Sequence, residues 1–297
     1  MRDRLHGIHP RSVVLVGGDV RAGRAAELVV ALFSDRCAVP LVAAPTTPPW
    51  VGPLDIVVVA GDDAGDPTLA ASIDGALRRS AEVVVDAPDE GPVRAVAAGR
   101  AVLLAPRVHV PTAYAFARHL AVFCVVLASL EASRLGGALP DLGMIADSVD
   151  SESARDHPSN EVFENPAKSL ATRMLSRRVV IAGDSPTTAV LARHATDTLL
   201  QVAGVIATPA ALPDVLVARD RLLDSTAASD TYDPFFHDEE LDGPAPVAPV
   251  RVFVLSTDED RPAARREPRH YRIWNWCLLW GSSKPVRYRL RSNRWRY

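Results

Sequence analysis

Several features are scarce in this 297-residue chain, and each scarcity excludes a class of protein. Its three cysteines, Cys37, Cys124 and Cys277, lie far apart and none belongs to a CxxC pair. This spacing argues against a disulfide scaffold and a structural zinc site, and it favours a reducing compartment. The longest uncharged apolar run, 120–130, is far shorter than the ~20 residues that span a bilayer, and no signal peptide is evident. We therefore expect a cytoplasmic protein that has no membrane partner.

Lysine is scarce as well, since only Lys168 and Lys284 stand among 33 basic residues and the others are arginines. The formal net charge of −3 hides an uneven distribution of charge along the chain. From position 268 onward seven arginines, one lysine and no acid give +8, so residues 1–267 carry −11, with 25 basic and 36 acidic residues. An acidic body does not attract polyanions, and we therefore expect no nucleic-acid partner.

The segment 265–297 differs in composition from everything before it. No alanine follows Ala264, and four of the five tryptophans lie in the last 24 residues. We interpret this segment as an atypical basic, aromatic tail that results from a shifted reading frame or is an unrelated extension. The alternative is an interaction tail whose arginines and aromatic rings contact nucleic acid or membrane.

Short β-branched apolar runs alternate with helical patterns, which is typical of parallel sheets covered by helices on both faces. The expected strands are Ser12–Val16, Val39–Ala43, Asp55–Ala60, Glu82–Asp86, Ala101–Ala105, Arg178–Ala182 and Arg251–Leu255. The expected helices are Ala22–Phe33, Asp66–Arg79, Pro92–Ala98, Thr112–Leu135, Glu161–Ser176 and Pro186–Val202. Residues 222–249 are polar and proline-rich, as in a loop. The pattern predicts an α/β fold of two tandem doubly wound parallel-sheet units, with binding crevices at the carboxyl ends of the strands.

The same pattern suggests where the units begin and end. The first unit spans 1–135 and closes with a long helix that Gly136-Gly137 would terminate. Residues 136–160 are rich in glycine, serine and aspartate, and we interpret them as a linker. The second unit spans 161–264, and the atypical tail follows it.

Glycines and aspartates gather where two of the expected strands end. The turn 17–19 begins with two glycines, which suits a tight passage from strand to helix, and no GxGxxG fingerprint accompanies it. Asp62, Asp63 and Asp66 precede a helix, and capping of that helix explains them. A cation or amine site formed together with Asp19 is the alternative. We predict neither a cofactor nor a metal.

Four stretches carry a resemblance to a known family. They are the Gly17-Gly18 turn after its strand, the strand 55–59 with the turn after it, the helix after Pro111, and Glu164-Asn165-Pro166-Ala167-Lys168. Together they resemble tandem sugar isomerase (SIS) domains, in particular the bifunctional phosphoglucose/phosphomannose isomerases of the actinobacterial TobH-like branch, over roughly residues 12–264. The resemblance implies flavodoxin-like sheets, sugar-phosphate ligands, commonly a homodimer, and aldose–ketose isomerisation.

The resemblance implies a set of ligand-binding positions, which are Gly17, Gly18, Asp19, Asp62, Gly65, Thr68, Thr112 and Arg193. Acids replace family hydroxyls at Asp19 and Asp62, and Thr112 stands where the family has arginine. A carboxylate about 4 Å from a phosphate oxygen repels it by about 4 kcal/mol at an effective dielectric near 20, whereas a helix N-terminus returns only about 0.3–1 kcal/mol. Asp62, Asp63 and Asp66 therefore predict that the usual phosphate cradle does not hold phosphate here.

The residues of proton transfer depart from the family as well. Gln201 stands where the family's glutamate base belongs, and an amide cannot act as a proton base at neutral pH. His237 and Glu164 are the candidates for relocated acid–base groups. Our leading hypothesis is a SIS-fold protein that binds a carbohydrate derivative such as a sugar phosphate and has a degenerate catalytic centre. The alternatives are an active mannose 6-phosphate/glucose 6-phosphate isomerase and a structural partner of an enzyme of sugar metabolism.

Overall fold

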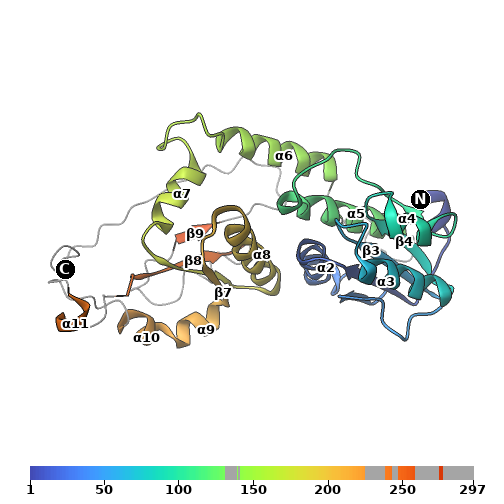
Figure 1. The fold of residues 1–297 in the computed structure, drawn as a ribbon, viewed down its shortest axis with the longest axis horizontal. Coiled ribbons are helices and arrows are strands. Elements are labelled where there is room, and N and C mark those ends of the chain that lie inside the picture. The colour runs from blue at the N-terminus through green and yellow to red at the C-terminus, as the bar shows by residue number, and fades with distance from the viewer. Residues whose placement is uncertain (131–138, 140, 225–237, 243–246, 258–273, 277–297) are drawn as a thin grey trace.

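The computed structural model describes residues 1–130, 139, 141–224, 238–242, 247–257 and 274–276, and its chain forms two halves that are each built on a parallel sheet (Figure 1). The first sheet consists of β1 (Ser12–Gly17), β2 (Leu41–Ala44), β3 (Asp55–Ala60), β4 (Glu82–Asp86) and β5 (Val102–Leu103). The second sheet consists of β6 (Arg178–Gly183), β7 (Ala207–Ala211), β8 (Val250–Leu255) and β9 (Trp274–Trp276).

The order of the strands gives each sheet a topological switch point. The first sheet has the order β2-β1-β3-β4-β5, and the second follows the same scheme over its described strands, β7-β6-β8-β9. Every pairing is parallel. This is the flavodoxin-like order, and it confirms the prediction of two doubly wound units. In such sheets ligands bind beyond the carboxyl ends of the strands at the switch point, which lies between β1 and β3 and between β6 and β8.

Four helices cover the first sheet. They are α2 (Val20–Phe33) and α5 (Phe116–Ala128) on one face, and α3 (Pro67–Arg78) and α4 (Gly91–Ala97) on the other. Val13 and Leu15 pack against the first pair, whereas Val14 and Val16 pack against the second. Because both faces are buried, β1 is apolar throughout instead of alternating. Each side chain of this kind contributes about 1.5–3 kcal/mol when fully buried, so this sheet is a firm base for the crevice at its edge.

Helices also cover both faces of the second sheet. They are α7 (Pro166–Met174) and α8 (Pro186–Ala203) on one face, and α9 (Leu212–Val217) and α10 (Arg219–Asp224) on the other. Ile181 and Phe253 belong to the first cluster of buried side chains, and Ala182 and Val254 belong to the second. Three further short elements are α1 (Arg2–Leu5), the 3-10 turn η1 (Thr112–Tyr114) and α11 (Glu239–Asp242).

The helix expected over 112–135 is shorter in the structure. Residues 112–114 form η1, and α5 then runs only to Ala128. The Ser129 hydroxyl donates to the Val125 carbonyl (2.8 Å), and the Leu130 amide bonds to the Leu127 carbonyl, so the last turn tightens and the helix ends. Gly136-Gly137, which we expected to terminate the helix, lies outside the described residues.

The segment expected as a linker, 136–160, contains the helix α6 (Leu142–Arg155). Asp141 caps its first turn, and the Ser148 and Ser151 hydroxyls bond back to carbonyls four residues earlier instead of breaking the helix. All of its residues are exposed or half-buried and the helix is more polar than the core helices α2 and α5, so the segment carries a weaker helical signal than they do.

Two further boundaries differ from the expectation for physical reasons. The helix expected from Glu161 begins at Pro166, because the Asn165 side chain accepts from the Lys168 amide (2.8 Å) and proline favours the first helical position. The strand β7 was not predicted, since it holds Pro209 and alanines. It lies at the edge of its sheet, where proline is tolerated. Within the described part of the chain, no helix has the length and apolarity to cross a membrane.

Candidate functional site

Two glycines bring the end of β1 against the helices around it. A Cβ at Gly17 would lie 2.3 Å from the Gly23 amide nitrogen, and one at Gly18 would lie 2.6 Å from Leu69 Cδ1. Glycine is therefore required at position 17 for the close contact of α2 with the strand, in agreement with the interpretation of a tight turn, whereas at position 18 the end of the Leu69 side chain could shift. Gly183 plays the same part in the second half, where a Cβ would lie 2.3 Å from the Ala189 amide nitrogen.

The Asp19 carboxylate occupies the N-terminus of α2, directly beyond β1. Its Oδ1 accepts from the amides of Arg21 (2.8 Å) and Ala22 (3.0 Å). Its Oδ2 accepts from the amide of Asp62 (3.0 Å), which follows β3. A single side chain thus takes up backbone donors from both sides of the switch point, where an anionic ligand would find them.

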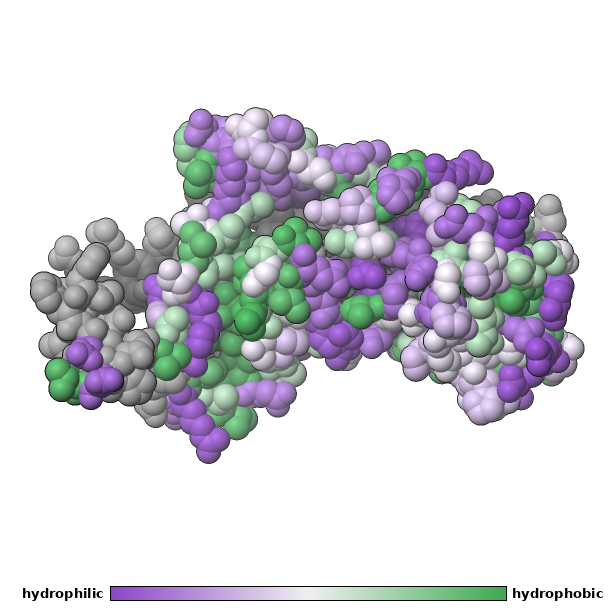
Figure 2. Space-filling model, in the orientation of Figure 1, coloured by the Kyte–Doolittle hydropathy of each residue, from purple (hydrophilic) through white to green (hydrophobic). Residues whose placement is uncertain are grey.

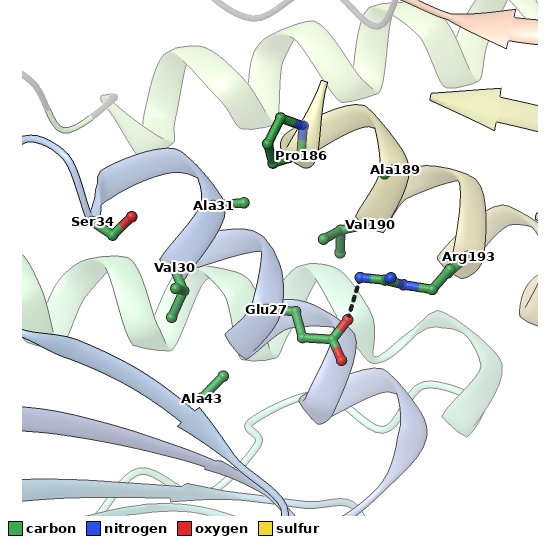
Figure 3. A pocket seen from close by; sticks show the side chains of 9 residues that line it. All are labelled: Glu27, Val30, Ala31, Ser34, Ala43, Pro186, Ala189, Val190 and Arg193. Atoms are coloured by element: carbon green, nitrogen blue, oxygen red, sulfur yellow. Dashed lines mark hydrogen bonds and ion pairs between the residues drawn. The ribbon is translucent and has the colours of Figure 1, made fainter. Parts of the chain in front are cut away.

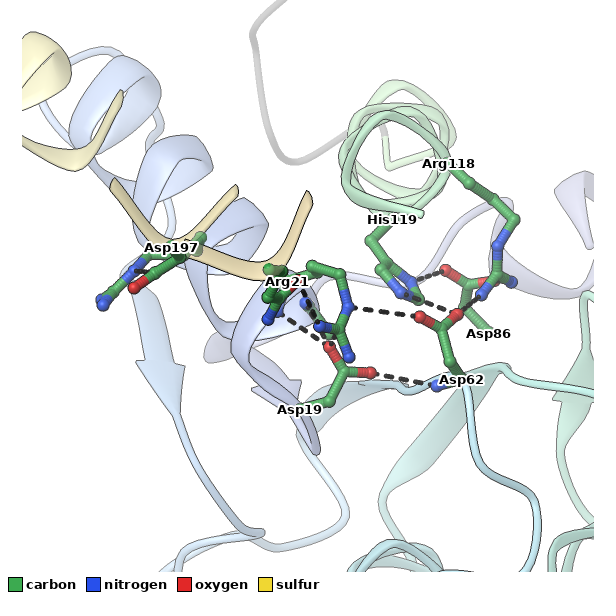
Figure 4. Close-up of polar contacts among 10 residues, drawn as sticks. Asp19, Arg21, Asp62, Asp86, Arg118, His119 and Asp197 are labelled. Atoms are coloured by element: carbon green, nitrogen blue, oxygen red, sulfur yellow. Dashed lines mark hydrogen bonds and ion pairs between the residues drawn. The ribbon is translucent and has the colours of Figure 1, made fainter. Parts of the chain in front are cut away.

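Asp62 is surrounded by cationic groups from two helices (Figure 4). Arg118 Nη2 donates to its Oδ1 (2.6 Å), while Arg118 Nη1 donates to Asp86, the last residue of β4. Arg21 Nε lies 3.6 Å from Asp62 Oδ2 and 3.5 Å from Asp19 Oδ1. Arg118 thereby joins the ends of β3 and β4 to α5.

His119 lies behind this ion network. Its ring is fully buried, and its Nδ1 is 2.7 Å from Asp86 Oδ2, also fully buried. Its Nε2 is 3.3 Å from Asp62 Oδ1, but the two atoms lack the alignment of a hydrogen bond, and no other described residue partners Nε2. The Asp86 carboxylate therefore fixes the orientation of the ring and directs Nε2 toward Asp62.

The charges of the network balance. Burial lowers the pKa of His119, but its contacts with Asp62 and Asp86 outweigh burial and raise that pKa above the ordinary value. Burial raises the pKa of Asp62, but His119 and Arg118 outweigh it and hold that pKa below the usual range. Three carboxylates and two guanidinium groups leave a charge of −1, which a protonated His119 cancels.

Only one of the three aspartates around position 64 belongs to this network. Asp63 accepts from the amide of Gly65 (2.7 Å) within its own loop, and Asp66 caps α3 by accepting from the amide of Thr68 (2.8 Å). Capping therefore accounts for Asp66, as expected, whereas Asp62 is paired with cations. The expectation of three uncompensated acids facing a ligand is corrected accordingly, because it omitted Arg118 and Arg21.

One sequence-predicted catalytic position reaches this site from the second half. Arg21 Nη1 donates to Gln201 Oε1 (3.3 Å), near the end of α8. The other contacts between α2 and α8 lie further along the helices, where Arg24 pairs with Asp197 (2.9 Å) and Arg193 pairs with Glu27 (3.0 Å).

Arg193, a predicted ligand-binding residue, borders a groove of about 500 Å³ between α2 and α8 (Figure 3). The groove is lined by Glu27, Val30, Ala31, Ser34, Ala43, Pro186, Ala189, Val190 and Arg193. In the view of Figure 2 the middle of the molecule, where these helices meet, is mostly hydrophilic, and apolar side chains gather over the second half.

The structure does not bring the other predicted site residues into the network. Gly65 and Thr68 are exposed where α3 begins, Thr112 is exposed in η1, and Glu164 is exposed before α7. His237 lies outside the described residues. Arg118 and His119 were missed, because they stand in a helix whose other residues are mostly apolar. An Arg-His pair near the start of a core helix was the one available signal.

Comparisons with known proteins identify similar folds among solved structures. No family model and no curated protein matches the sequence. A proposed phosphosugar isomerase from Salmonella typhimurium LT2 has a similar structure, with a TM-score of 0.58 and 15% identity over 93% of this chain and 79% of that one. A second proposed phosphosugar isomerase, from Bacillus subtilis, gives a TM-score of 0.57 and 12% identity over 93% of this chain and 80% of that one.

A third similar structure is the C-terminal domain of glucosamine-fructose-6-phosphate aminotransferase from Francisella tularensis. It gives a TM-score of 0.53 and 11% identity over 91% of this chain and 78% of that one. At these identities the likeness establishes the fold. The expected tandem arrangement of two doubly wound parallel sheets is confirmed at that level.

Proposed function

We propose that this chain binds a carbohydrate derivative in the crevice beyond β1 and β3 and does not isomerise it. The binding part rests on the fold, because doubly wound sheets bind ligands at the switch point. The similar structures named above include proteins whose names refer to sugar phosphates, which supports the same class of ligand.

The position of the Asp19 carboxylate carries the second part of the proposal. This carboxylate accepts hydrogen bonds from three backbone amides that would otherwise be free to hold a phosphoryl oxygen. A phosphate dianion beside this carboxylate is repelled by about 4 kcal/mol per charge pair at 4 Å and an effective dielectric near 20. Arg21 and Arg118 offset part of this repulsion, so the proposal rests mainly on the occupied amides, which the Asp19 carboxylate denies to a phosphoryl group.

The crevice suits hydroxyl groups better than a phosphoryl group. Asp62 Oδ2 accepts no hydrogen bond from any described residue, and it becomes an acceptor for a sugar hydroxyl when Arg21 moves aside. At the implied position of the catalytic base, Gln201 offers an amide that can orient a ligand but cannot exchange a proton. We therefore expect affinity to come from the sugar and little of it from the phosphate.

An active isomerase is the second candidate, and the pairing of His119 with Asp86 favours it. A carboxylate-oriented imidazole is a common acid–base group in enzymes. His119 is fully buried, however, and Asp62 stands before its Nε2, so a substrate would have to displace that carboxylate. We rank this candidate second for that reason.

The test combines turnover with binding. Mannose 6-phosphate or glucose 6-phosphate is incubated with the protein, and fructose 6-phosphate is measured; we expect none above a protein-free control. Calorimetry is run with the same phosphates and with the neutral sugars, and we expect each neutral sugar to bind at least as tightly as its phosphate. Product that disappears in Asp86→Asn would establish the second candidate instead. No binding of any sugar would contradict the binding part and favour a structural partner.

A further inference from the structure

We propose that Asp19, Asp62 and His119 form a binding site for a divalent transition-metal ion, and that Arg21 fills this site in the metal-free protein. The inference concerns the same crevice as the proposed function but does not rest on it, because its test measures binding of the ion alone. It departs from the expectation that the chain has no metal, and it takes up the alternative of a cation site that includes Asp19.

The three side chains have the spacing that a metal requires. One ligand atom from each lies within 4.8 Å of the other two. Two ligands about 2.1 Å from a tetrahedral ion are about 3.4 Å apart, and His119 Nε2 lies 3.3 Å from Asp62 Oδ1. Each residue comes from a different element beside the switch point, namely the turn after β1, the turn after β3, and α5.

The state of His119 is an independent sign of a ligand. Its ring is fully buried and its Nε2 is aimed into the cluster, yet within the described chain this nitrogen has no hydrogen-bond partner. Asp86 Oδ2 binds the opposite nitrogen, Nδ1. A carboxylate that holds the far nitrogen of a histidine is the usual support of a metal-binding imidazole, because it orients the ring and strengthens its basicity.

Arg21 is a weakly held cation at the position where the ion would sit. The Nε atom of Arg21 lies 3.5 Å from Asp19 Oδ1 and 3.6 Å from Asp62 Oδ2. This atom makes no hydrogen bond to either carboxylate or to another described residue. Its only described side-chain hydrogen bond goes from Nη1 to Gln201 at 3.3 Å. The side chain can therefore turn toward Gln201 without breaking a strong contact in the cluster.

The charge of the site matches a divalent ion. With Arg21 withdrawn, the carboxylates of Asp19, Asp62 and Asp86 and the guanidinium of Arg118 sum to −2. One imidazole nitrogen and two carboxylates favour Zn²⁺, Co²⁺ or Mn²⁺ over Ca²⁺, which prefers oxygen ligands alone. Three protein ligands leave coordination positions for water or another small molecule.

The test is titration of the full, chelator-treated chain with Zn²⁺ and, separately, Co²⁺ by calorimetry. We expect one ion per chain, a weakening of about 10- to 100-fold in Asp86→Asn, and a larger loss in His119→Gln and Asp62→Asn. Asp63→Asn and His194→Gln are the matched controls, since one alters the neighbouring acid and the other a second, half-buried histidine outside the cluster. Both controls should bind as the unaltered chain does.

Arg21→Ala keeps the proposal testable if the buried variants fail to fold. Removing the competing cation should tighten Zn²⁺ binding by about two- to fivefold. The absence of binding by the unaltered chain would overturn the proposal. Binding that survives His119→Gln in a folded variant, or that Asp63→Asn weakens as much as Asp62→Asn does, would overturn it as well.

Discussion

At the scale of single residues, the account rests on what surrounds Asp62. The sequence placed acids beyond β3 correctly, but it could not show that Arg118 and Arg21 lie against one of them. Arg118 is 56 positions away from Asp62, on another element. Local capping by Asp63 and Asp66 could be anticipated, since it depends only on neighbours in the chain.

The end of β1 offers a matched test of packing. Gly17→Ala should lower the free energy of unfolding by about 1–3 kcal/mol or more, because the new Cβ meets the backbone of α2 at 2.3 Å. Gly23→Ala places a methyl group in open space within the same helix, and it should raise the free energy of unfolding by about 0.5–1 kcal/mol. Urea unfolding measures both, and equal effects would contradict the described contact.

A second residue-scale prediction concerns Cys124 on α5. Burial raises the pKa of its thiol to about 11, so at pH 8 only about one molecule in a thousand carries the reactive thiolate. Iodoacetamide labelling followed by peptide mass spectrometry should find half-buried Cys37 modified well before Cys124 in the native chain. Both should react in urea. Rapid native labelling of Cys124 would show that α5 does not bury it.

A third residue-scale prediction concerns acid stability through Asp55. Burial raises the pKa of this carboxyl, but the hydrogen bonds from Arg11, Ser12 and the Gly52 amide outweigh it and lower the pKa below the ordinary 3.8. The stability that the ionised Asp55 carboxylate adds to the folded chain is therefore fully present above pH 3.8. It is lost as the pH falls through the lower pKa that Asp55 has in the folded chain.

Asp55→Asn should accordingly destabilise the chain at neutral pH and have a progressively smaller effect as the solution is acidified. Urea unfolding at a series of pH values, with the unaltered chain measured in parallel, tests this. A difference between the two proteins that stays constant into acid would contradict the assigned partners of Asp55.

At the scale of elements, the apolar strands were predictable and the polar or small-residue elements were not. β1 and β3 are runs of valine, leucine and isoleucine with both faces buried, which few other structures accommodate. β7 consists of alanine, threonine and proline, and α6 is more polar than the core helices and buries none of its residues, so both carry a weak signal. Contacts elsewhere in the fold, as well as local composition, determine such elements.

The N-terminus of α8 provides an element-scale prediction. Ser185 and Thr188 form a capping box, so Ser185→Ala should cost about 0.5–2 kcal/mol in the free energy of unfolding. Ser148→Ala on the exposed helix α6 is the control. It removes a bond to the helix's own backbone and should be neutral or slightly stabilising. Thermal unfolding of both variants distinguishes them, and equal losses would argue against the capping box.

At the scale of the whole molecule, the two halves meet along α2 and α8. Arg24 with Asp197 and Arg193 with Glu27 are partly exposed ion pairs, each of which contributes about 0–1 kcal/mol. Phe116 and His194 add a stacked ring contact at 3.8 Å. These partners are far apart in sequence, up to 180 positions for Arg21 and Gln201, so no local pattern could have predicted that the site draws on both halves.

The central claim is that the Asp19 carboxylate takes the place of a ligand's phosphate, and one calorimetric comparison tests it most directly. Fructose 6-phosphate is titrated into the unaltered chain and into Asp19→Ser, which keeps an N-cap oxygen but removes the charge. We predict at least about tenfold tighter binding by the variant, since it removes a negative charge beside the phosphate, while the neighbouring cations and rearrangement offset part of the about 4 kcal/mol of repulsion per charge pair. Tight binding by the unaltered chain that Asp19→Ser leaves unchanged or weakens would contradict the account.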